Sequence, residues 1–358
     1  MCIDGKNQER THLVMKIVVL AGGTSTEREI SIISGTGVCR ALRQKGHQAV
    51  LVDVFAGMEE VKIEEIFDGE YDVDAAVEYI CSFNDKIPKM QRERREFFGP
   101  NVLELCKAAD VVFLALHGAN GEDGKVQAAL DLNGIKYTGA GHTRSAMAMD
   151  KGITKAIFQM HQVPTPKGVT MSVKKRTDDL SVHGLEFPVV VKTCCGGSSI
   201  GVYIVRNQEE YVKALDEAYS YENEVVIEEF IQGKEYTVAV VDGEALPVVS
   251  IEPVSGFYDY RNKYEPGATI EICPAPLSEK LTRQMQEYAC QGYKALGIEG
   301  YGRLDFMMDE EGKMYCLEAN TLPGMTPTSL IPQEAAAVGM DYPTLCEYLI
   351  EVSMKKYQ

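Results

Sequence analysis

Short apolar runs alternate with helical patterns in the first part of the chain. Runs with the length of buried strands stand at residues 16–21, 48–54 and 110–116. Behind the first run, Gly22-Gly23 marks a turn, and Val38, Ala41 and Leu42 recur at helical spacing. Strands that alternate with helices predict an open parallel α/β sheet.

The loops after two of these strands carry polar residues. Ligands of open α/β sheets bind beyond the carboxyl ends of the strands. Glu27 follows the first run and His117 follows the third, so we expect both side chains at a ligand site on this edge. Residues 57–100, by contrast, are charged and show no clear period, which predicts an irregular surface insertion.

The pattern changes from residue 187 onward. Short strand-like runs now follow one another closely, at residues 187–192, 201–205, 224–229, 235–241 and 245–251. Turns such as Asp242-Gly243 indicate antiparallel pairing. The order predicted is an α/β domain, then a small α+β domain, then a second antiparallel sheet with helices.

An excess of acidic residues limits the partners that the chain can have. The 358 residues include 36 Lys and Arg against 53 Asp and Glu, which gives a net charge of −17. This charge repels a phosphate backbone, so nucleic acid is not an expected partner. A bound polyanion would need a local basic cluster and a divalent metal. No run of 18 apolar residues occurs, so no membrane insertion is expected.

The N-terminus and the cysteines indicate the compartment. Residues 1–12 are polar and lack the apolar stretch of a signal peptide, and residues 1–14 are expected to be a disordered extension. Met15 is an alternative start. The ten cysteines include no CxxC pair, which favours reduced thiols and a cytoplasmic location.

A glycine-rich loop, GGSSIG, lies at residues 196–201 between two predicted strands. Backbone N–H groups of such a loop can surround phosphate oxygens, and Lys192 precedes the loop as a phosphate partner. An ordinary glycine hairpin explains the string equally well. The strings of a P-loop and of a dinucleotide-binding fingerprint are both missing.

Two strand segments near the C-terminus carry alternating polar residues. Arg303 and Asp305 share one face of a strand, as do Glu318 and Asn320, and a hairpin turn at residues 308–313 would pair the two strands. Hard oxygen ligands beside a phosphate site suit Mg²⁺. The alternative is a solvated, charged sheet face whose buried side consists of Leu304, Phe306, Leu317 and Ala319.

Two further loops could contact a ligand. The segment at residues 318–330 contains Pro323-Gly324 and several hydroxyl groups, which is typical of a loop that offers N–H groups to an oxyanion or a carboxylate. The aromatic and basic stretch at residues 257–264 is either a lid over a charged ligand or a packed surface loop.

Together these segments resemble the D-alanine–D-alanine ligases of the ATP-grasp superfamily. The resemblance extends from Met15 to about Tyr348 and is carried by the strings at residues 20–31, 117–124, 149–151, 197–201, 258–264 and 318–330. It implies an N-terminal α/β substrate-binding domain at 1–149, a central ATP-grasp lobe at 150–232 and a C-terminal lobe at 233–358. It also implies a cytoplasmic homodimer that serves peptidoglycan synthesis.

The resemblance implies a reaction in which ATP phosphorylates one D-alanine and the amine of a second D-alanine attacks the acylphosphate. Two Mg²⁺ or Mn²⁺ ions would be held by Asp305, Asn320 and a bridging Glu318, and Arg303 would steady the transferring phosphoryl group. Gly324 would donate an N–H to the carbonyl oxygen. The residues implied for ATP binding are Lys151, Lys192, Glu228, Glu229, Phe230, Ile231 and Glu235.

The same resemblance implies the amino acid sites. Glu27 would pair with the ammonium group of the first D-alanine, and His117 would lie near its carboxylate. Ser198 and Tyr264 would link to Glu27. The carboxylate of the second D-alanine would lie among Lys263, Ser329 and Leu330.

Departures from the family and alternatives remain. Lys192 is followed by Thr193-Cys194-Cys195 where the family has proline, and the two thiols are either reactive beside the phosphates or buried and inert. A D-alanine–D-lactate or D-alanine–D-serine ligase is one alternative, although Tyr264 favours the dipeptide. Another carboxylate–amine ligase and a non-catalytic nucleotide-binding regulatory protein are the others.

Overall fold

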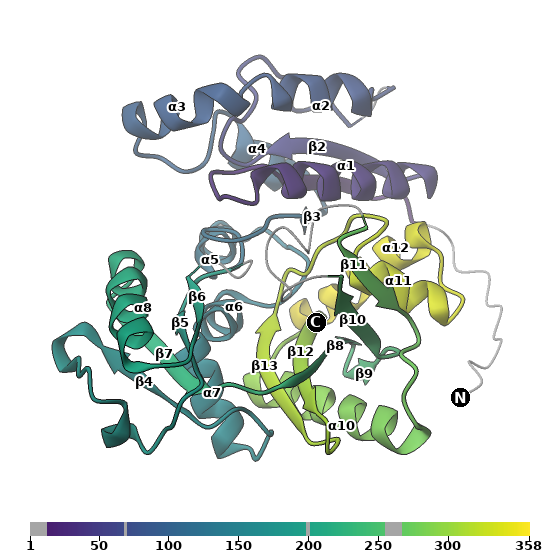
Figure 1. Cartoon of the computed structure of the whole chain (residues 1–358). Coiled ribbons are helices and arrows are strands. Elements are labelled where there is room, and N and C mark those ends of the chain that lie inside the picture. Colours follow the sequence, from purple (N-terminus) through teal and green to yellow (C-terminus); the bar gives the residue numbers. More distant parts are fainter. Residues whose placement is uncertain (1–12, 68–69, 198–200, 255–266) are drawn as a thin grey trace.

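The computed structural model describes residues 13–67, 70–197, 201–254 and 267–358. Figure 1 shows an N-terminal unit above two antiparallel sheets that lie beside each other. No helix in these four ranges is long and apolar enough to cross a membrane. The predicted extension falls mostly on residues 1–12, which lie outside the description.

The N-terminal unit is built on a parallel sheet of three strands in the order β2-β1-β3. Its strands are β1 (Lys16–Ala21), β2 (Gln48–Asp53) and β3 (Val111–Leu114). All but the first residue of β1 and β2 are buried, as the continuous apolar runs predicted. The parallel α/β prediction is therefore confirmed. The helices of this unit are α1 (Arg28–Gln44), α2 (Val73–Cys81), α3 (Ile87–Glu93), α4 (Val102–Ala108) and α5 (Lys125–Leu132).

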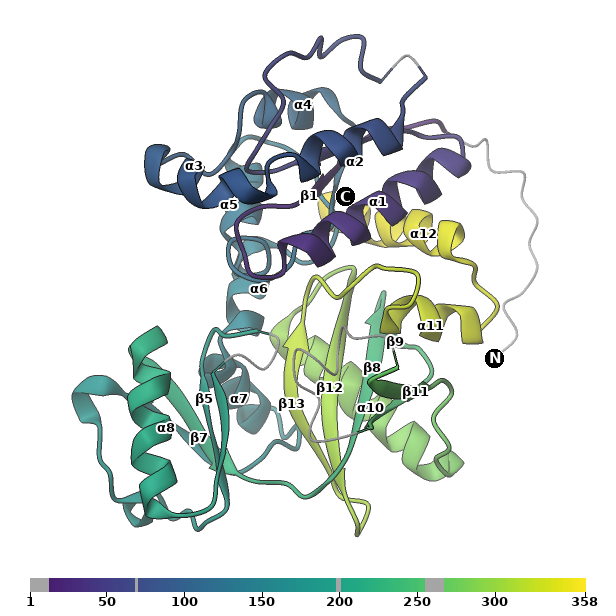
Figure 2. The same ribbon diagram turned by 45° about the horizontal axis from the view of Figure 1, so that its top comes forward.

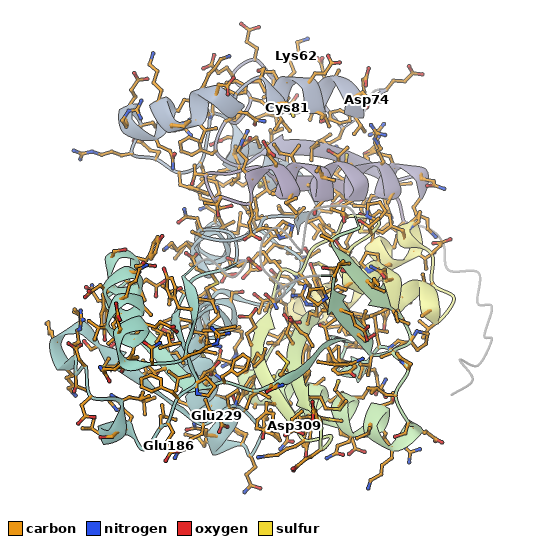
Figure 3. The ribbon with its side chains drawn as sticks, viewed as in Figure 1. Lys62, Asp74, Cys81, Glu186, Glu229 and Asp309 are labelled. Carbon is orange, nitrogen blue, oxygen red and sulfur yellow. The ribbon has the colours of Figure 1, made fainter. Side chains whose placement is uncertain are left out.

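The expectation of an irregular insertion at residues 57–100 is wrong. This segment contains α2, α3 and the short 3-10 helix η1 (Asn84–Lys86). Val73, Ala76, Val77 and Ile80 recur at helical spacing and pack against the core of the sheet. Asp72 caps α2 by accepting hydrogen bonds from two N–H groups. Charges on the outer face obscured this short apolar stripe; Figure 3 labels Asp74 on α2, at the outer edge of the molecule.

The middle of the chain forms a four-stranded antiparallel sheet in the order β4-β7-β5-β6. Its strands are β4 (Gly168–Ser172), β5 (Val189–Thr193), β6 (Val202–Val205) and β7 (Glu224–Glu229). Helix α8 (Gln208–Tyr221) covers one face of this sheet (Figure 1). The remaining elements here are α6 (His142–Met149), α7 (Lys151–Met160), η2 (Val173–Lys175) and η3 (Leu180–His183).

The third sheet follows the order β11-β10-β8-β12-β13, and β9 pairs with β8. Asp242 and Gly243 both have positive φ between β8 and β9, which confirms the predicted hairpin turn. Its strands are β8 (Gly233–Val241), β9 (Glu244–Ala245), β10 (Val249–Pro253), β11 (Thr269–Ile272), β12 (Tyr301–Asp309) and β13 (Met314–Asn320). The helices are α10 (Glu279–Leu296), α11 (Leu330–Ala337), α12 (Tyr342–Met354) and η4 (Lys355–Tyr357).

Helix α12 connects the third sheet to the N-terminal unit. It packs on α1, and one apolar cluster contains residues of β1, α1, α12 and β12. Figure 2 shows α1 and α12 side by side above the third sheet. This contact places the carboxyl edge of the parallel sheet over the loop that follows β13.

A β-bulge separates β12 and β13 into two registers. Asp305 lies opposite Glu318, whereas Phe306 lies opposite Cys316, so Leu317 is the extra residue. Cys316 is fully buried with Leu304, Phe306 and Ala319, while Leu317 turns to the opposite face. The expectation that Leu317 belongs to the buried side is therefore wrong, because simple alternation does not hold across a bulge.

Candidate active site

Two neighbouring cavities lie where the three units meet. The first has a volume of about 390 Å³ and extends from the N-terminal unit to the loop after β13. The second has a volume of about 180 Å³ and lies between the two antiparallel sheets. Lys151, Gly196, Gly197 and Glu318 line both cavities. The two spaces therefore share a wall on which both cationic and anionic groups are present.

The second cavity collects every residue that was expected to bind ATP. Its apolar walls were not predicted, although Val190 and Ile204 stand on β5 and β6 at positions that alternate with buried valines. A flat apolar slot with charged groups at one end suits a heteroaromatic base that carries phosphates. The lining residues from the prediction are Lys151, Lys192, Glu228, Glu229, Phe230, Ile231 and Glu235.

Behind this cavity, one carboxylate is shared by two lysines. Glu228 Oε1 lies 2.6 Å from Lys192 Nζ, Glu228 Oε2 pairs with Lys155 Nζ, and Lys155 Nζ also donates to Thr165 Oγ1 at 2.9 Å. Burial opposes ionisation of Glu228, but Lys155 and Lys192 hold its pKa below the ordinary value. Burial, reinforced by Lys192, lowers the pKa of Lys155 to about 8. Sequence reasoning missed Lys155.

The hairpin of β12 and β13 brings the expected metal ligands together. Asp305 faces Glu318 and Arg303 faces Asn320 across the two strands. Arg303 donates two hydrogen bonds of 2.8 Å to Asp305, Asn320 Nδ2 donates to Asp305 Oδ2 at 2.9 Å, and Lys151 Nζ lies 3.1 Å from Glu318 Oε2. Side chains of the protein thus balance both carboxylates.

The donor set fits a hard divalent cation. Within the described ranges, no group of three or more His, Cys, Asp and Glu side chains is arranged to hold a metal ion. Asn320 must therefore complete the set, and its oxygen is left to do so because its nitrogen donates to Asp305. Two carboxylates and an amide oxygen are the ligands that Mg²⁺ and Mn²⁺ accept.

The first cavity holds Glu27 and His117 from the parallel sheet, as expected. His117 Nδ1 lies 3.2 Å from the carbonyl oxygen of Leu322, so this nitrogen carries the proton, and Nε2 lies 3.2 Å from Ser34 Oγ. The ring is therefore held between α1 and the loop after β13. A Cβ atom on Gly197 would lie 3.5 Å from Glu27 Oε2, so the glycine-rich loop begins beside Glu27.

The loop after β13 closes the other end of the first cavity. Ser329 Oγ accepts a hydrogen bond of 3.0 Å from the N–H of Thr326, and Ser329 is the N-cap of α11. A Cβ on Gly324 would lie 2.8 Å from Ser329 Oγ, so only glycine fits there without displacement. The first N–H groups of α11, from Leu330 onward, lack helical partners and can bind an anion.

Comparisons with known proteins agree with this geometry. The family model described as D-ala D-ala ligase N-terminus matches residues 16–140, and that described as D-ala D-ala ligase C-terminus matches residues 151–351. The chain belongs to the D-alanine–D-alanine ligase family. Its division at 149/150 and 232/233 stays a prediction.

Curated and solved members of the family cover nearly the whole chain. The D-alanine–D-alanine ligase of Lacticaseibacillus casei is 42% identical over 348 residues, which are 96% of this chain and 97% of the relative. That of Desulfotalea psychrophila is 37% identical, over 98% of each chain. The ligase of Bacillus anthracis complexed with ATP superposes with a TM-score of 0.73 at 30% identity and covers 96% and 98% of the two chains. The ATP-grasp fold expected from the sequence is thus confirmed.

Three residues of the predicted ligase site, Ser198, Lys263 and Tyr264, lie outside the described residues. The structure instead adds residues that sequence reasoning missed. Thr237 Oγ1 donates to Asp305 Oδ1 at 2.6 Å from the neighbouring strand, Ser34 holds His117, and Glu271 lines the first cavity. Polar residues at alternate strand positions were the available signal for Thr237 and Glu271.

The cysteines after Lys192 do not have the surroundings of reactive thiolates. Burial raises the pKa of Cys194 to about 12 and that of Cys195 to about 11, and Glu222 and Asp150 add to both shifts. The N–H of Cys195 donates to the carboxylate of Glu222. Lys192 is paired with Glu228 instead. Of the two alternatives, the structure favours inert thiols.

Proposed function

We propose that this chain joins two D-alanine molecules in an ATP-dependent reaction that yields D-alanyl-D-alanine, ADP and phosphate for peptidoglycan synthesis. Membership of the ligase family supports the proposal. The observation that carries it is the shared wall of the two cavities, where Lys151 and Glu318 face both spaces. A phosphoryl group can pass from a nucleotide in one cavity to a carboxylate in the other.

The second cavity takes ATP in this proposal. The base lies between the apolar walls near Phe230 and Ile231, Glu235 binds the ribose, and Lys151 and Lys192 meet the phosphates. Glu228 and Glu229 belong to the segment that meets the base. Because Glu228 is buried between two lysines, its carboxylate acts on the nucleotide mainly by fixing Lys192.

Two Mg²⁺ or Mn²⁺ ions are proposed as cofactors, held by Asp305, Asn320 and a bridging Glu318. When bound, they offset the charge of the phosphates and of the carboxylate that approaches them. Arg303 lies beside Asp305 and is placed to steady the transferring phosphoryl group. The hydroxyl group of Thr237 keeps Asp305 oriented toward this site.

The first cavity takes the two amino acids. Glu27 pairs with the ammonium group of the donor D-alanine and His117 lies near its carboxylate, while Gly324 offers an N–H to the carbonyl oxygen. Ser329 and Leu330, at the N-terminus of α11, bind the carboxylate of the acceptor. The acceptor amine then attacks the acylphosphate carbon, and phosphate leaves. Exclusion of water protects the acylphosphate from hydrolysis.

The remaining roles rest on the resemblance alone. Ser198 and Tyr264 would link a closing loop to Glu27, and Lys263 would meet the acceptor carboxylate. We also propose a homodimer in the cytoplasm, where ATP is available. Size-exclusion chromatography with light scattering measures the oligomeric state, and a monomer at micromolar concentration would contradict this part.

Phosphate release from ATP tests the activity. We expect D-alanine to support turnover with Mg²⁺ or Mn²⁺ and L-alanine to give background rates, with D-alanyl-D-alanine identified by mass spectrometry. D-lactate or D-serine is added with D-alanine in parallel reactions. A depsipeptide or a D-alanyl-D-serine product in excess would indicate the alternative ligases. ATP binding without ADP formation would indicate a non-catalytic regulatory protein.

A further inference from the structure

One wall of the first cavity carries a carboxylate that the proposed reaction does not yet use. Glu271 stands on the edge strand β11, and its neighbours Ile270 and Ile272 are 54% and 39% exposed on the opposite face. Alternation along the strand therefore turns Glu271 toward the cavity that it lines. The same end of the cavity is lined by Thr326, Pro327, Thr328, Ser329 and Leu330.

An amide from α11 fixes this carboxylate. Gln333 Nε2 donates to Glu271 Oε2 at 2.5 Å and to the carbonyl oxygen of Thr328 at 2.8 Å. Gln333 thereby ties Glu271 to the loop that precedes Ser329. Because the amide is neutral, it orients the carboxylate and leaves its charge in place.

Cations in the same cavity are paired with other acids. Arg303 binds Asp305 and Lys151 binds Glu318, both at the end of the cavity shared with the nucleotide. Across the part of the chain that the structure describes, no ion pair involves Glu271. The acceptor end of the cavity thus combines an anion-binding helix N-terminus with a negative charge on the wall beside it.

We propose that Glu271 is a specificity-determining residue that selects acceptors bearing an ammonium group. The inference rests on the proposed function. D-alanine arrives as a zwitterion, so its carboxylate can meet the N-terminus of α11 while its ammonium group meets the field of Glu271. D-lactate has the same carboxylate and no cation, so the field of Glu271 disfavours its entry.

Four enzymes test the proposal: wild type, Glu271→Gln, Glu271→Asp and Glu310→Gln. Glu310 lies exposed in the β12–β13 turn and serves as the control. With MgATP and donor D-alanine saturating, we expect Glu271→Gln to raise the KM for the acceptor about fivefold, as for one partly solvated charge. Its kcat should stay within about twofold of wild type, and its depsipeptide fraction with D-lactate should rise about tenfold.

Two further measurements separate charge from packing. Glu271→Asp keeps the charge and should recover most of the acceptor KM. Raising the salt concentration should raise the acceptor KM of wild type more than that of Glu271→Gln, because salt screens a partly exposed charge. Thermal unfolding of each variant shows whether the fold is kept, and if Glu271→Gln does not fold, the salt dependence of wild type decides.

The outcomes distinguish this inference from the proposed function. Dipeptide synthesis by wild type, with an unchanged acceptor KM or an unchanged depsipeptide fraction in Glu271→Gln, overturns the role of Glu271 alone. An equal change in Glu310→Gln overturns it as well. If wild type forms no dipeptide, the proposed function fails and the role of Glu271 fails with it.

Discussion

Replacement of Lys155 by methionine tests how the nucleotide cavity keeps its positive charge. Lys155 lines neither cavity and reaches the nucleotide only through Glu228, which it shares with Lys192. The three side chains are at most 7% exposed. Together they carry one net positive charge at pH 7. Lys155→Met removes that charge and leaves Lys192 neutralised by Glu228.

The structure sets the size of the effect. The variant loses a charge-assisted bond to Glu228, about 1.5–3 kcal/mol, and a bond to Thr165, about 1 kcal/mol. Methionine restores part of the packing, so about 3 kcal/mol is the net cost. An unfolding entropy of about 2.1 cal/mol/K per residue over 358 residues converts this into a Tm about 4 °C lower. Loss of one positive charge should weaken ATP binding about tenfold, or 1.4 kcal/mol.

Calorimetry of ATP binding and thermal unfolding measure both quantities, with the exposed Lys280→Met on α10 as control. Because burial lowers the pKa of Lys155 to about 8, this lysine is charged at pH 7 and mostly neutral at pH 9. The difference in ATP affinity between wild type and Lys155→Met should therefore shrink from pH 7 to pH 9. An affinity and a Tm equal to those of the control would refute the role of Lys155.

Three other outcomes follow from the buried groups and the metal site. Glu318→Gln should keep the fold and lose most activity at any Mg²⁺ concentration, since a neutral amide cannot bridge two cations; near-normal turnover would argue against this ligand. Burial raises the pKa of Cys106 to about 12 against 9.0 unfolded, so this thiol's contribution to stability is complete below pH 9 and falls by about 1.4 kcal/mol per unit above it. Cys106→Val should flatten the decline of the unfolding free energy between pH 9 and 10.5 by that amount, and an equal slope would contradict it. Iodoacetamide at pH 8 should label Cys81, exposed on α2 (Figure 3), well before Cys194 and Cys195, as peptide mass spectrometry can check; the reverse order would contradict the burial argument.

Local signals in the sequence were sufficient for most elements. The apolar run at residues 16–21 became a buried parallel strand, and Asp242-Gly243 became a tight hairpin turn because both residues adopt positive φ. The pairing of Asp305 with Glu318 followed from alternation and a six-residue turn. Each of these depends on neighbours within one hairpin or one strand, where spacing alone fixes the geometry.

The errors arose where a single residue changed the local rule. Leu317 left the buried face because a bulge shifts the register by one residue, and no composition signal marks that position. Lys155 was invisible because its partners come from β7 and β5, far along the chain. A helical lysine that follows Lys151 by one turn is ordinarily a surface residue, and only the packing of α7 against the middle sheet buries it.

Glu334 shows why the acceptor end of the cavity could not be derived from spacing. Residues 245–251 were expected to form one strand, but Pro247 separates β9 from β10. The strand pairs on that side of β8 therefore stop at Thr237 and resume at Val240, and the N–H of Ala239 donates to Glu334 at 2.7 Å. Ala239 lies opposite Arg303, and Glu334 belongs to the helix capped by Ser329. The distance between the acceptor site and the phosphoryl-binding arginine thus depends on a break in a strand some 80 residues away from the helix that repairs it, which no local pattern encodes.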